Sequence, residues 1–94
     1  MGDAKFTPGP WEVQPIFPGR CRVVSKERDL DVCDLRCDEN DEEAVAATHA
    51  DALLIAKAPD LYELVEWALD EGVLGDGEWR LKATAALAKA RGEP

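Results

Sequence analysis

Cysteine and histidine have the most distinctive chemistry in this sequence, because a thiolate or an imidazole can bind a metal ion or act in nucleophilic catalysis. The chain has three cysteines and one histidine: Cys21, Cys33, Cys37 and His49. Cys33 and Cys37 are four residues apart, within the ligand spacing of zinc knuckles, so the four side chains form one possible zinc ligand set. Against zinc, no Cys-x-x-Cys pair occurs and the other two residues are isolated. The simpler interpretation is that Cys21 and Cys33 are small core hydrophobes, and we expect neither a metal nor another cofactor.

Enzymatic chemistry has little support in the residue pattern. His49 falls in the middle of a predicted helix, and no nucleophile elbow or cysteine-protease signature accompanies it. The glycines at 72, 75 and 77 follow a predicted helix rather than a strand, which is the wrong context for a phosphate-binding loop. We therefore expect a protein that is not an enzyme.

Negative charge is the outlying property of the composition. The chain has 20 acidic and 11 basic residues and a net charge of −9. Residues 1–28 carry a net charge of +2, whereas residues 29–43 contain eight acids and a single base, a net charge of −7. So acidic a protein is repelled by nucleic acids and anionic membranes and attracted to basic protein surfaces.

The predicted partner-binding residues follow from this asymmetry. They comprise the acidic run before the first helix and the acidic side of the second: Asp38, Glu39, Asp41, Glu42 and Glu43, with Asp60, Glu63 and Asp70. The plainer alternative is that the run is a solvated turn that caps a helix, since carboxylates suit a helix N-terminus.

Two other binding patterns remain open. One is a homo-oligomer that captures a small nucleotide or a phage partner in a pocket between subunits, using Trp11, Tyr62, Trp67 or Arg80. The spacing of the aromatic residues favours core packing instead. A short basic set beside Trp79 is the best nucleic-acid candidate, but the net charge argues against it; it comprises Arg80, Lys82, Lys89 and Arg91.

Helical periodicity organises the centre of the chain. Residues 41–57 are predicted to form an amphipathic helix capped by Asn40 or Asp41, with this apolar stripe: Val45, Thr48, Ala52, Ile55 and Ala56, widened by Leu53 and Leu54. Pro59 should end it and lie in the first turn of a second helix over 59–71, which Gly72 stops. The face of that helix is Leu61, Leu64, Val65, Ala68 and Leu69.

The remaining elements complete an α+β domain. Strands are predicted within about residues 11–36, at 11–14, 21–25 and 30–35, where Pro15 indicates an edge strand or an early end. A third helix over about 77–90 carries Trp79, Ala83, Ala86, Leu87 and Ala90 on one face, with Asp76 as its cap. We predict a single domain, 1–94, with a small antiparallel sheet of two or three strands packed on two or three helices.

Localisation follows from what the sequence lacks. No apolar run approaches the roughly 18 residues of a membrane span, and the first residues lack the regions of a signal peptide. We expect a cytoplasmic protein.

Two motifs resemble a family of small phage and prophage proteins. Residues 7–11 read TPGPW, and residues 51–63 read DALLIAKAPDLYE, similar to the family pattern N-A-x-L-I-A-A-A-P-E-L-L-E. Asp51 replaces the Asn and Lys57 replaces an Ala, and the part beyond Gly72 is not covered. The resemblance implies a phage-encoded accessory protein in the cytoplasm of an infected bacterium, without implying catalytic residues.

Resemblance and charge together give two function hypotheses. The first, by analogy with anti-CRISPR proteins, is a non-enzymatic inhibitor of a host defence complex whose carboxylates contact a surface meant for nucleic acid. It binds a host protein or ribonucleoprotein, not nucleic acid or membrane directly, and a homodimer is possible. The alternative is a homo-oligomeric phage accessory module that binds a small nucleotide or another phage protein.

Overall fold

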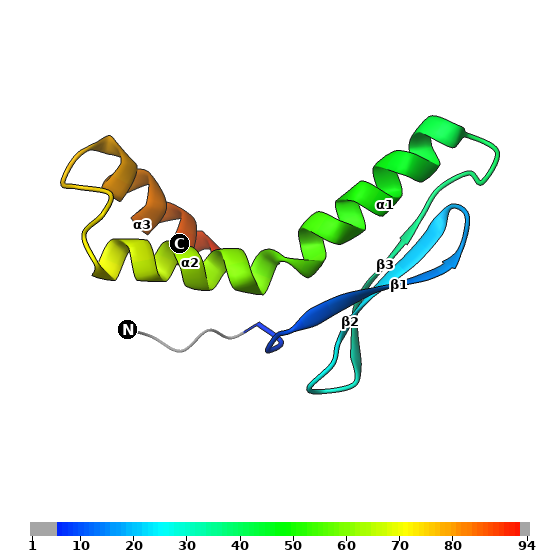
Figure 1. Ribbon diagram of the computed structural model, residues 1–94, viewed down its shortest axis with the longest axis horizontal. Coiled ribbons are helices and arrows are strands. Elements are labelled where there is room, and N and C mark those ends of the chain that lie inside the picture. Colours follow the sequence, from blue (N-terminus) through cyan, green and yellow to red (C-terminus); the bar gives the residue numbers. More distant parts are fainter. Residues whose placement is uncertain (1–5, 93–94) are drawn as a thin grey trace. The chain divides into compact units, whose positions relative to one another are not determined.

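The computed structural model describes residues 6–92 of the chain as an α+β protein (Figure 1). Its elements, in chain order, are β1 (Trp11–Phe17), β2 (Arg20–Ser25), β3 (Leu30–Arg36), α1 (Glu42–Ala56), α2 (Ala58–Asp70) and α3 (Glu78–Ala90). The fold class predicted from the sequence, a small antiparallel sheet with two or three helices, is confirmed with three strands and three helices in the described residues. These residues divide into two compact units, which we call the sheet unit (Thr7–Pro59) and the helical unit (Phe6 with residues 60–92).

The sheet is an antiparallel meander in the order β1-β2-β3. Cys21, Val23 and Ser25 of β2 are buried and point to one face, since successive side chains of a strand alternate. Val23 pairs with Val13 on one side and with Cys33 on the other. Val32 is skipped in the register of β3, which is a β-bulge, and the bulge lets both Leu30 and Cys33 lie opposite core-facing residues of β2.

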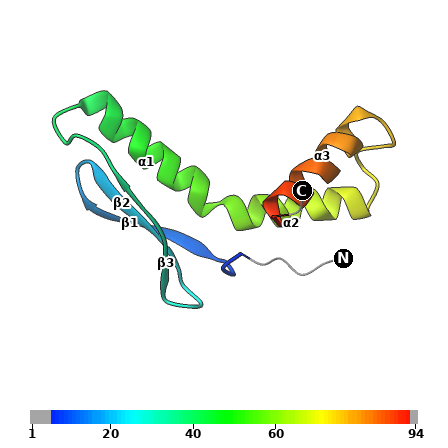
Figure 2. The same ribbon diagram turned by 180° about the vertical axis from the view of Figure 1, so that it is seen from behind.

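The core of the sheet unit forms where α1 crosses this face, as both views show (Figures 1 and 2). Its fully covered members are Cys21, Val23, Ala52 and Ala56. The small alanines let the helix backbone approach the sheet closely, and partly buried side chains pack around them: Trp11, Val13, Val32, Cys33, Leu35 and Ile55.

Two hydrogen bonds hold the backbone of the TPGPW motif (residues 7–11) against β1 and β2. The indole Nε1 of Trp11 donates to the Thr7 carbonyl at 3.0 Å, and the buried Ser25 hydroxyl donates to the Pro8 carbonyl at 2.8 Å. A Cβ placed on Gly9 would lie 3.0 Å from the Cβ of Pro59. The two motifs that resemble phage proteins therefore touch each other, and a side chain at position 9 would crowd this contact.

The ends of α1 and α2 follow their sequence signals. The Asp41 carboxylate accepts a hydrogen bond from the Ala44 N–H at 3.1 Å and caps α1. Gly72 adopts φ +70° after α2, and the Gly72 and Val73 N–H groups donate to the Leu69 and Ala68 carbonyls. This is a Schellman motif, which explains why the helix stops there.

In the helical unit, α3 folds back beside α2, and hydrogen bonds from Arg91 link the end of α3 to α2. Arg91 at the end of α3 donates from Nε to the Tyr62 hydroxyl at 2.5 Å and from Nη2 to Glu66 at 3.0 Å. The Phe6 ring meets the Tyr62 ring edge-on, with centroids 4.9 Å apart. Tyr62 and Leu87 are the hydrophobic side chains of this unit that are buried among the described residues.

Three local expectations are wrong. The first strand continues through Pro15 to Phe17, because β1 is an edge strand where a missing N–H is tolerated and the register shifts after Pro15. Gly77, without a side-chain hydrogen bond, caps α3 in place of Asp76. Leu53 and Leu54, expected to widen the stripe of the first helix, are 50% and 64% exposed.

Candidate functional site

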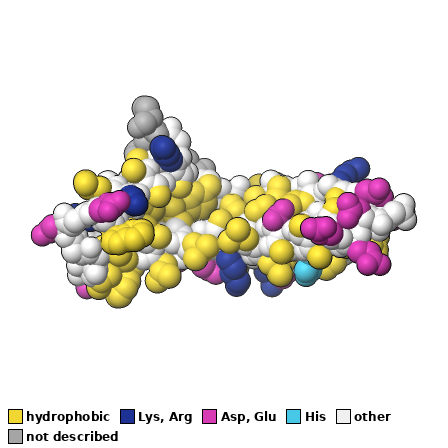
Figure 3. Space-filling view, turned by 90° about the horizontal axis from the view of Figure 1, so that it is seen from above, with side chains coloured by type: hydrophobic (Ala, Val, Ile, Leu, Met, Phe, Trp, Pro, Cys, Tyr) yellow, Lys and Arg dark blue, Asp and Glu magenta, His cyan; other side chains and the backbone are white. Residues whose placement is uncertain are grey.

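The predicted acidic run forms an exposed patch at the connection between β3 and α1. We call it the acidic patch; its residues are Asp38, Glu39, Asp41, Glu42 and Glu43. All five side chains are exposed, and acidic side chains gather over the beginning of α1 in Figure 3. Within residues 6–92 none of the five forms a salt bridge.

Two members of the acidic patch also have structural roles. Asp38 accepts a hydrogen bond from the Asn40 N–H at 2.9 Å, and Asp41 caps α1. Glu42 and Glu43 lie in the first helical turn, where the helix dipole favours negative charge. The plain alternative, a helix-capping turn, is thus correct for Asp41, while Glu39 makes no hydrogen bond or ion pair within the described residues.

Charged side chains on the sheet, unlike those of the acidic patch, form ion pairs with one another. Arg20 donates two hydrogen bonds to Asp34, at 3.2 and 2.8 Å, and Arg36 approaches the same carboxylate at 3.5 Å. The hydrogen bond from Arg20, helped by the positive charges of Arg20 and Arg36, lowers the Asp34 pKa to about 2. Further ion pairs join Lys26 to Glu12 at 3.3 Å and Arg22 to Asp31 at 3.8 Å. Arg20, Arg22, Lys26 and Arg36 are therefore paired with acids on or beside the sheet, and none of them compensates the charge of the acidic patch.

The other predicted contact acids lie elsewhere. Asp60, Glu63 and Asp70 are exposed on α2, in the helical unit. The acidic patch belongs to the sheet unit, so the eight predicted residues are distributed over two separately packed parts of the chain.

The four possible zinc ligands do not assemble. Cys21 Sγ lies 4.0 Å from His49 Nδ1, but no group of three or more His, Cys, Asp or Glu side chains placed to hold a metal ion occurs in the described part of the chain. Cys21 belongs to the core and Cys33 packs against it, as the simpler interpretation predicted. Burial raises the pKa of the Cys33 thiol, which disfavours the thiolate that a metal would need.

Cys21 and His49 border a cavity of about 340 Å³ beside the turn between β1 and β2. Most of its wall is apolar and comes from residues 15–19 with Val45 and Thr48. Among residues 6–92 no third side chain hydrogen-bonds to the imidazole to orient it, so the geometry gives no support for a catalytic triad.

Two of the four basic residues considered for nucleic acid, Arg91 and Lys82, form contacts inside the helical unit. Arg91 is bound to Tyr62 and Glu66, and hydrogen bonds to these two groups raise its pKa further. Lys82 pairs with Glu78 at 2.8 Å and lies 5.0 Å from the centroid of the Trp79 ring. Arg80 and Lys89 form no ion pair within residues 6–92, and two such cations make a small basic surface for the nucleic-acid interpretation.

The aromatic residues considered for a small-molecule pocket have separate environments. Trp11 packs against the sheet core, Tyr62 is buried against Arg91, and Trp67 is 53% exposed on α2. None of them, nor Arg80, lines the main groove of the helical unit.

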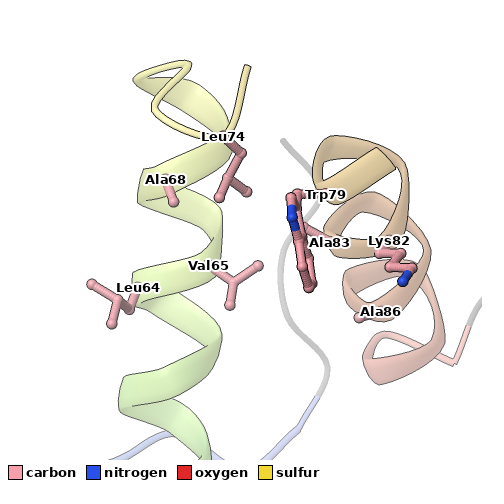
Figure 4. Close-up of a pocket in the computed structure, with 8 residues that line it drawn as sticks. All are labelled: Leu64, Val65, Ala68, Leu74, Trp79, Lys82, Ala83 and Ala86. Atoms are coloured by element: carbon pink, nitrogen blue, oxygen red, sulfur yellow. The ribbon is translucent and has the colours of Figure 1, made fainter. Parts of the chain in front are cut away.

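That groove is a feature that sequence reasoning did not identify as a site. It has a volume of about 440 Å³ and lies between α2 and α3, with the Trp79 ring on the side of α3 that faces α2 (Figure 4). Its walls are almost wholly apolar: Leu64, Val65, Ala68, Leu74, Trp79, Lys82, Ala83 and Ala86. The periodicity had placed most of these residues on apolar helix faces, but it could not show that the faces stay uncovered; Leu74, in the loop, gave no signal.

Fold and surfaces together define a small α+β protein with an unpaired acidic patch and an open apolar groove. No helix among residues 6–92 combines the length and apolar character that crossing a membrane requires. The family model of Salmonella phage P22 protein Y8K6 matches residues 1–94, and the chain belongs to this family. The predicted relation to small phage proteins is confirmed at that level. Searches of curated proteins and of solved structures found no match.

Proposed function

We propose that this phage protein is a non-enzymatic inhibitor of a host defence complex, in the manner of anti-CRISPR proteins. In this proposal the acidic patch occupies a basic protein surface that otherwise holds nucleic acid. The protein works in the cytoplasm of the infected bacterium, and its partner is a host protein or ribonucleoprotein.

The observation that supports this function is the contrast in charge pairing within the sheet unit. Arg20, Arg22 and Lys26 neutralise acids on the sheet, whereas the acidic patch presents five exposed carboxylates over six consecutive positions without an ion pair among the described residues. Closely spaced carboxylates attract basic surfaces at long range and raise the association rate. Asp60, Glu63 and Asp70 provide a second acidic surface on α2 that such a partner can also contact.

The test is the plating efficiency of a phage that a resident defence complex restricts, on bacteria that express this protein. The variant Glu39→Gln/Glu42→Gln/Glu43→Gln neutralises the patch and leaves the hydrogen-bonding carboxylates of Asp38 and Asp41 in place. We expect the unchanged protein to raise plating by at least tenfold and the triple variant to lose most of that gain. In binding assays with the purified complex, the affinity of the unchanged protein should fall steeply as salt increases.

A matched control distinguishes the effect of losing the acidic patch from the effect of losing negative charge in general. Glu27→Gln/Asp51→Asn/Asp76→Asn removes the same three negative charges from exposed positions outside the patch. This control should keep full inhibition. If the patch variant inhibits as well as the control, or if the unchanged protein protects phage from none of a panel of nucleic-acid-guided defence complexes, the proposal is wrong.

A second candidate is the homo-oligomeric accessory module that binds a small nucleotide or another phage protein. The apolar groove supports a protein partner more than a nucleotide, because Lys82 is its one cationic lining residue and is already paired with Glu78. A thermal-shift screen with nucleoside phosphates tests the nucleotide version. A rise in melting temperature that is lost in Lys82→Gln would favour it.

A further inference from the structure

The groove of the helical unit leaves large apolar side chains in contact with solvent. Leu64 is 58% exposed and Trp79 is 68% exposed, and both line it. Figure 4 shows Val65 and Trp79 facing each other across the opening, and hydrophobic side chains are exposed over α2 and α3 in Figure 3. A contiguous apolar surface of this kind usually marks an interaction site.

Two helices in a single hairpin share only one seam. Here Tyr62 and Leu87 are buried, whereas Val65 and Trp79 face each other across the open groove, so the two helices cover each other only in part. Helical hairpins commonly cover such faces with a second hairpin, giving a four-helix bundle. We propose that the α2–α3 hairpin binds the same hairpin of a second copy of this chain, groove against groove.

The charges beside the groove identify a second copy as a suitable occupant. Helix α2 carries four acidic residues and no basic one, whereas α3 carries three basic residues and one acidic residue. Glu71 directly follows α2, at helical spacing from Leu64 and Ala68. Lys82 lines the groove on α3, where its exposed ammonium group also pairs with Glu78. The surface is therefore acidic along one edge and basic along the other, which makes it complementary to itself.

The same charge pattern favours one of two possible two-fold arrangements of the dimer. A two-fold axis parallel to the helices places α2 of one copy on α3 of the other, with both hairpin turns at the same end, so that Glu71 approaches the partner copy's Lys82. The opposite end then brings Asp60 toward Lys89 of the other copy. A two-fold axis across the helices would instead stack acidic α2 on acidic α2, which like-charge repulsion disfavours.

Trp79 is the aromatic side chain that lines the groove and would be the centre of such an interface. Stable interfaces bury about 800 Å² on each partner, and one fully buried aromatic side chain supplies about 150–250 Å² of that. Trp79 and the leucines beside it provide an apolar centre, and tryptophan is among the residues that most often dominate binding energy at interfaces.

The direct test is the molar mass of the full chain, measured by light scattering after gel filtration over a range of protein concentrations. The expected value approaches twice the 10.3 kDa of one chain as concentration rises. A molar mass of one chain at every concentration up to several hundred micromolar would overturn the proposal.

Charge exchange tests the interface itself without relying on a destabilising core substitution. Lys82→Glu/Lys89→Glu makes both helices acidic, and Glu71→Lys/Asp60→Lys makes both edges of the groove basic. Each variant should weaken self-association by at least about tenfold, because like charges then meet across the interface. Mixing the two variants should restore a dimer, as heterodimers, in native mass spectrometry.

The mixture also guards against misfolding, since a misfolded variant would not regain a partner on mixing. Glu63→Lys, on α2 but outside the groove lining, is a matched control that should leave self-association unchanged. A dimer that survives both exchanged variants uses another surface and would contradict this assignment. The proposal is independent of the acidic patch, because neutralising Glu39, Glu42 and Glu43 should not alter the molar mass.

Discussion

The two units of the chain differ in how they use apolar side chains. The sheet unit covers Val23 completely between the sheet and α1, and charges on its strands are paired. The helical unit buries Tyr62 and Leu87 but leaves Trp79 and Leu64 largely exposed. The sheet unit therefore has the features of a folding core, and the helical unit has the features of a binding surface that a partner completes.

The most severe test of this difference is to shorten one apolar side chain in each unit. Val23→Ala removes two buried methyl groups and should lower the free energy of unfolding by about 2–3 kcal/mol, from lost burial plus a cavity. Leu81→Ala, on an α3 side chain that is 72% exposed, should cost no more than about 0.5 kcal/mol. Urea denaturation followed by circular dichroism, at one fixed protein concentration, gives both values. Equal losses would mean that the two units are packed equally well.

The contact between Gly9 and Pro59 in the sheet unit gives the next largest effect. Gly9→Ala places a Cβ 3.0 Å from Pro59 Cβ, and overpacking of this kind costs about 1–3 kcal/mol. The cost should shrink in a Pro59→Gly background, where the opposing atom is absent. A double-mutant cycle of unfolding free energies measures this coupling, and strictly additive effects would argue that the two residues do not touch.

The sequence predicted the elements well where the signal is local. Alternation marked the strands, a 3.6-residue period marked the helices, and Pro59 and Gly72 marked the ends of α2. The bulge at Val32 and the passage of β1 through Pro15 depend on the neighbouring strand, so no local pattern could reveal them. Periodicity indicates which side chains share a face, but not whether anything covers it.

The candidate sites show the same limit. Charge density alone identified the acidic patch. Asn40 and Asp41 were both candidate caps of the first helix, and only the backbone geometry shows that Asp41 is the cap and that Asp38 accepts a hydrogen bond from the Asn40 N–H. The helical stripe of Trp79, Ala83 and Ala86 predicts a buried face, whereas in the structure these residues line an open groove. Exposure is a tertiary property, and Leu74 reaches the groove from a loop with no pattern of its own.

A smaller effect tests the charge pairing of the sheet unit. Asp34 has a pKa of about 2 in the folded protein, chiefly because Arg20 hydrogen-bonds to it, against about 3.9 for an unperturbed aspartate. The carboxylate therefore adds stability that is complete above the unperturbed pKa and is lost as the pH falls toward 2. The stability difference between the unchanged protein and Asp34→Asn should be constant from pH 7 to about 5 and should close between about pH 4 and 2.

The Arg20→Gln background is the control for that titration. Removing the guanidinium removes the largest cause of the lowered pKa, so Asp34→Asn should then produce a much weaker dependence on pH. A gap that persists unchanged to pH 2, or that survives loss of Arg20, would show that the sheet does not depend on this pair.

The smallest expected effect concerns the helical unit, at the start of α3. Gly77 occupies the N-cap position with an extended backbone, φ −94° and ψ −153°, and offers no side chain to the first turn. Gly77→Ser supplies a hydroxyl for one of the unpaired N–H groups and should stabilise the helix by a few tenths of a kcal/mol. If the hairpin is completed by a second copy, this gain should appear in the unfolding midpoint most clearly at low protein concentration, where the helix has no partner to hold it. A loss of stability would mean that the cap position needs glycine for a reason other than its backbone angles, since a Cβ there meets no atom within 4 Å.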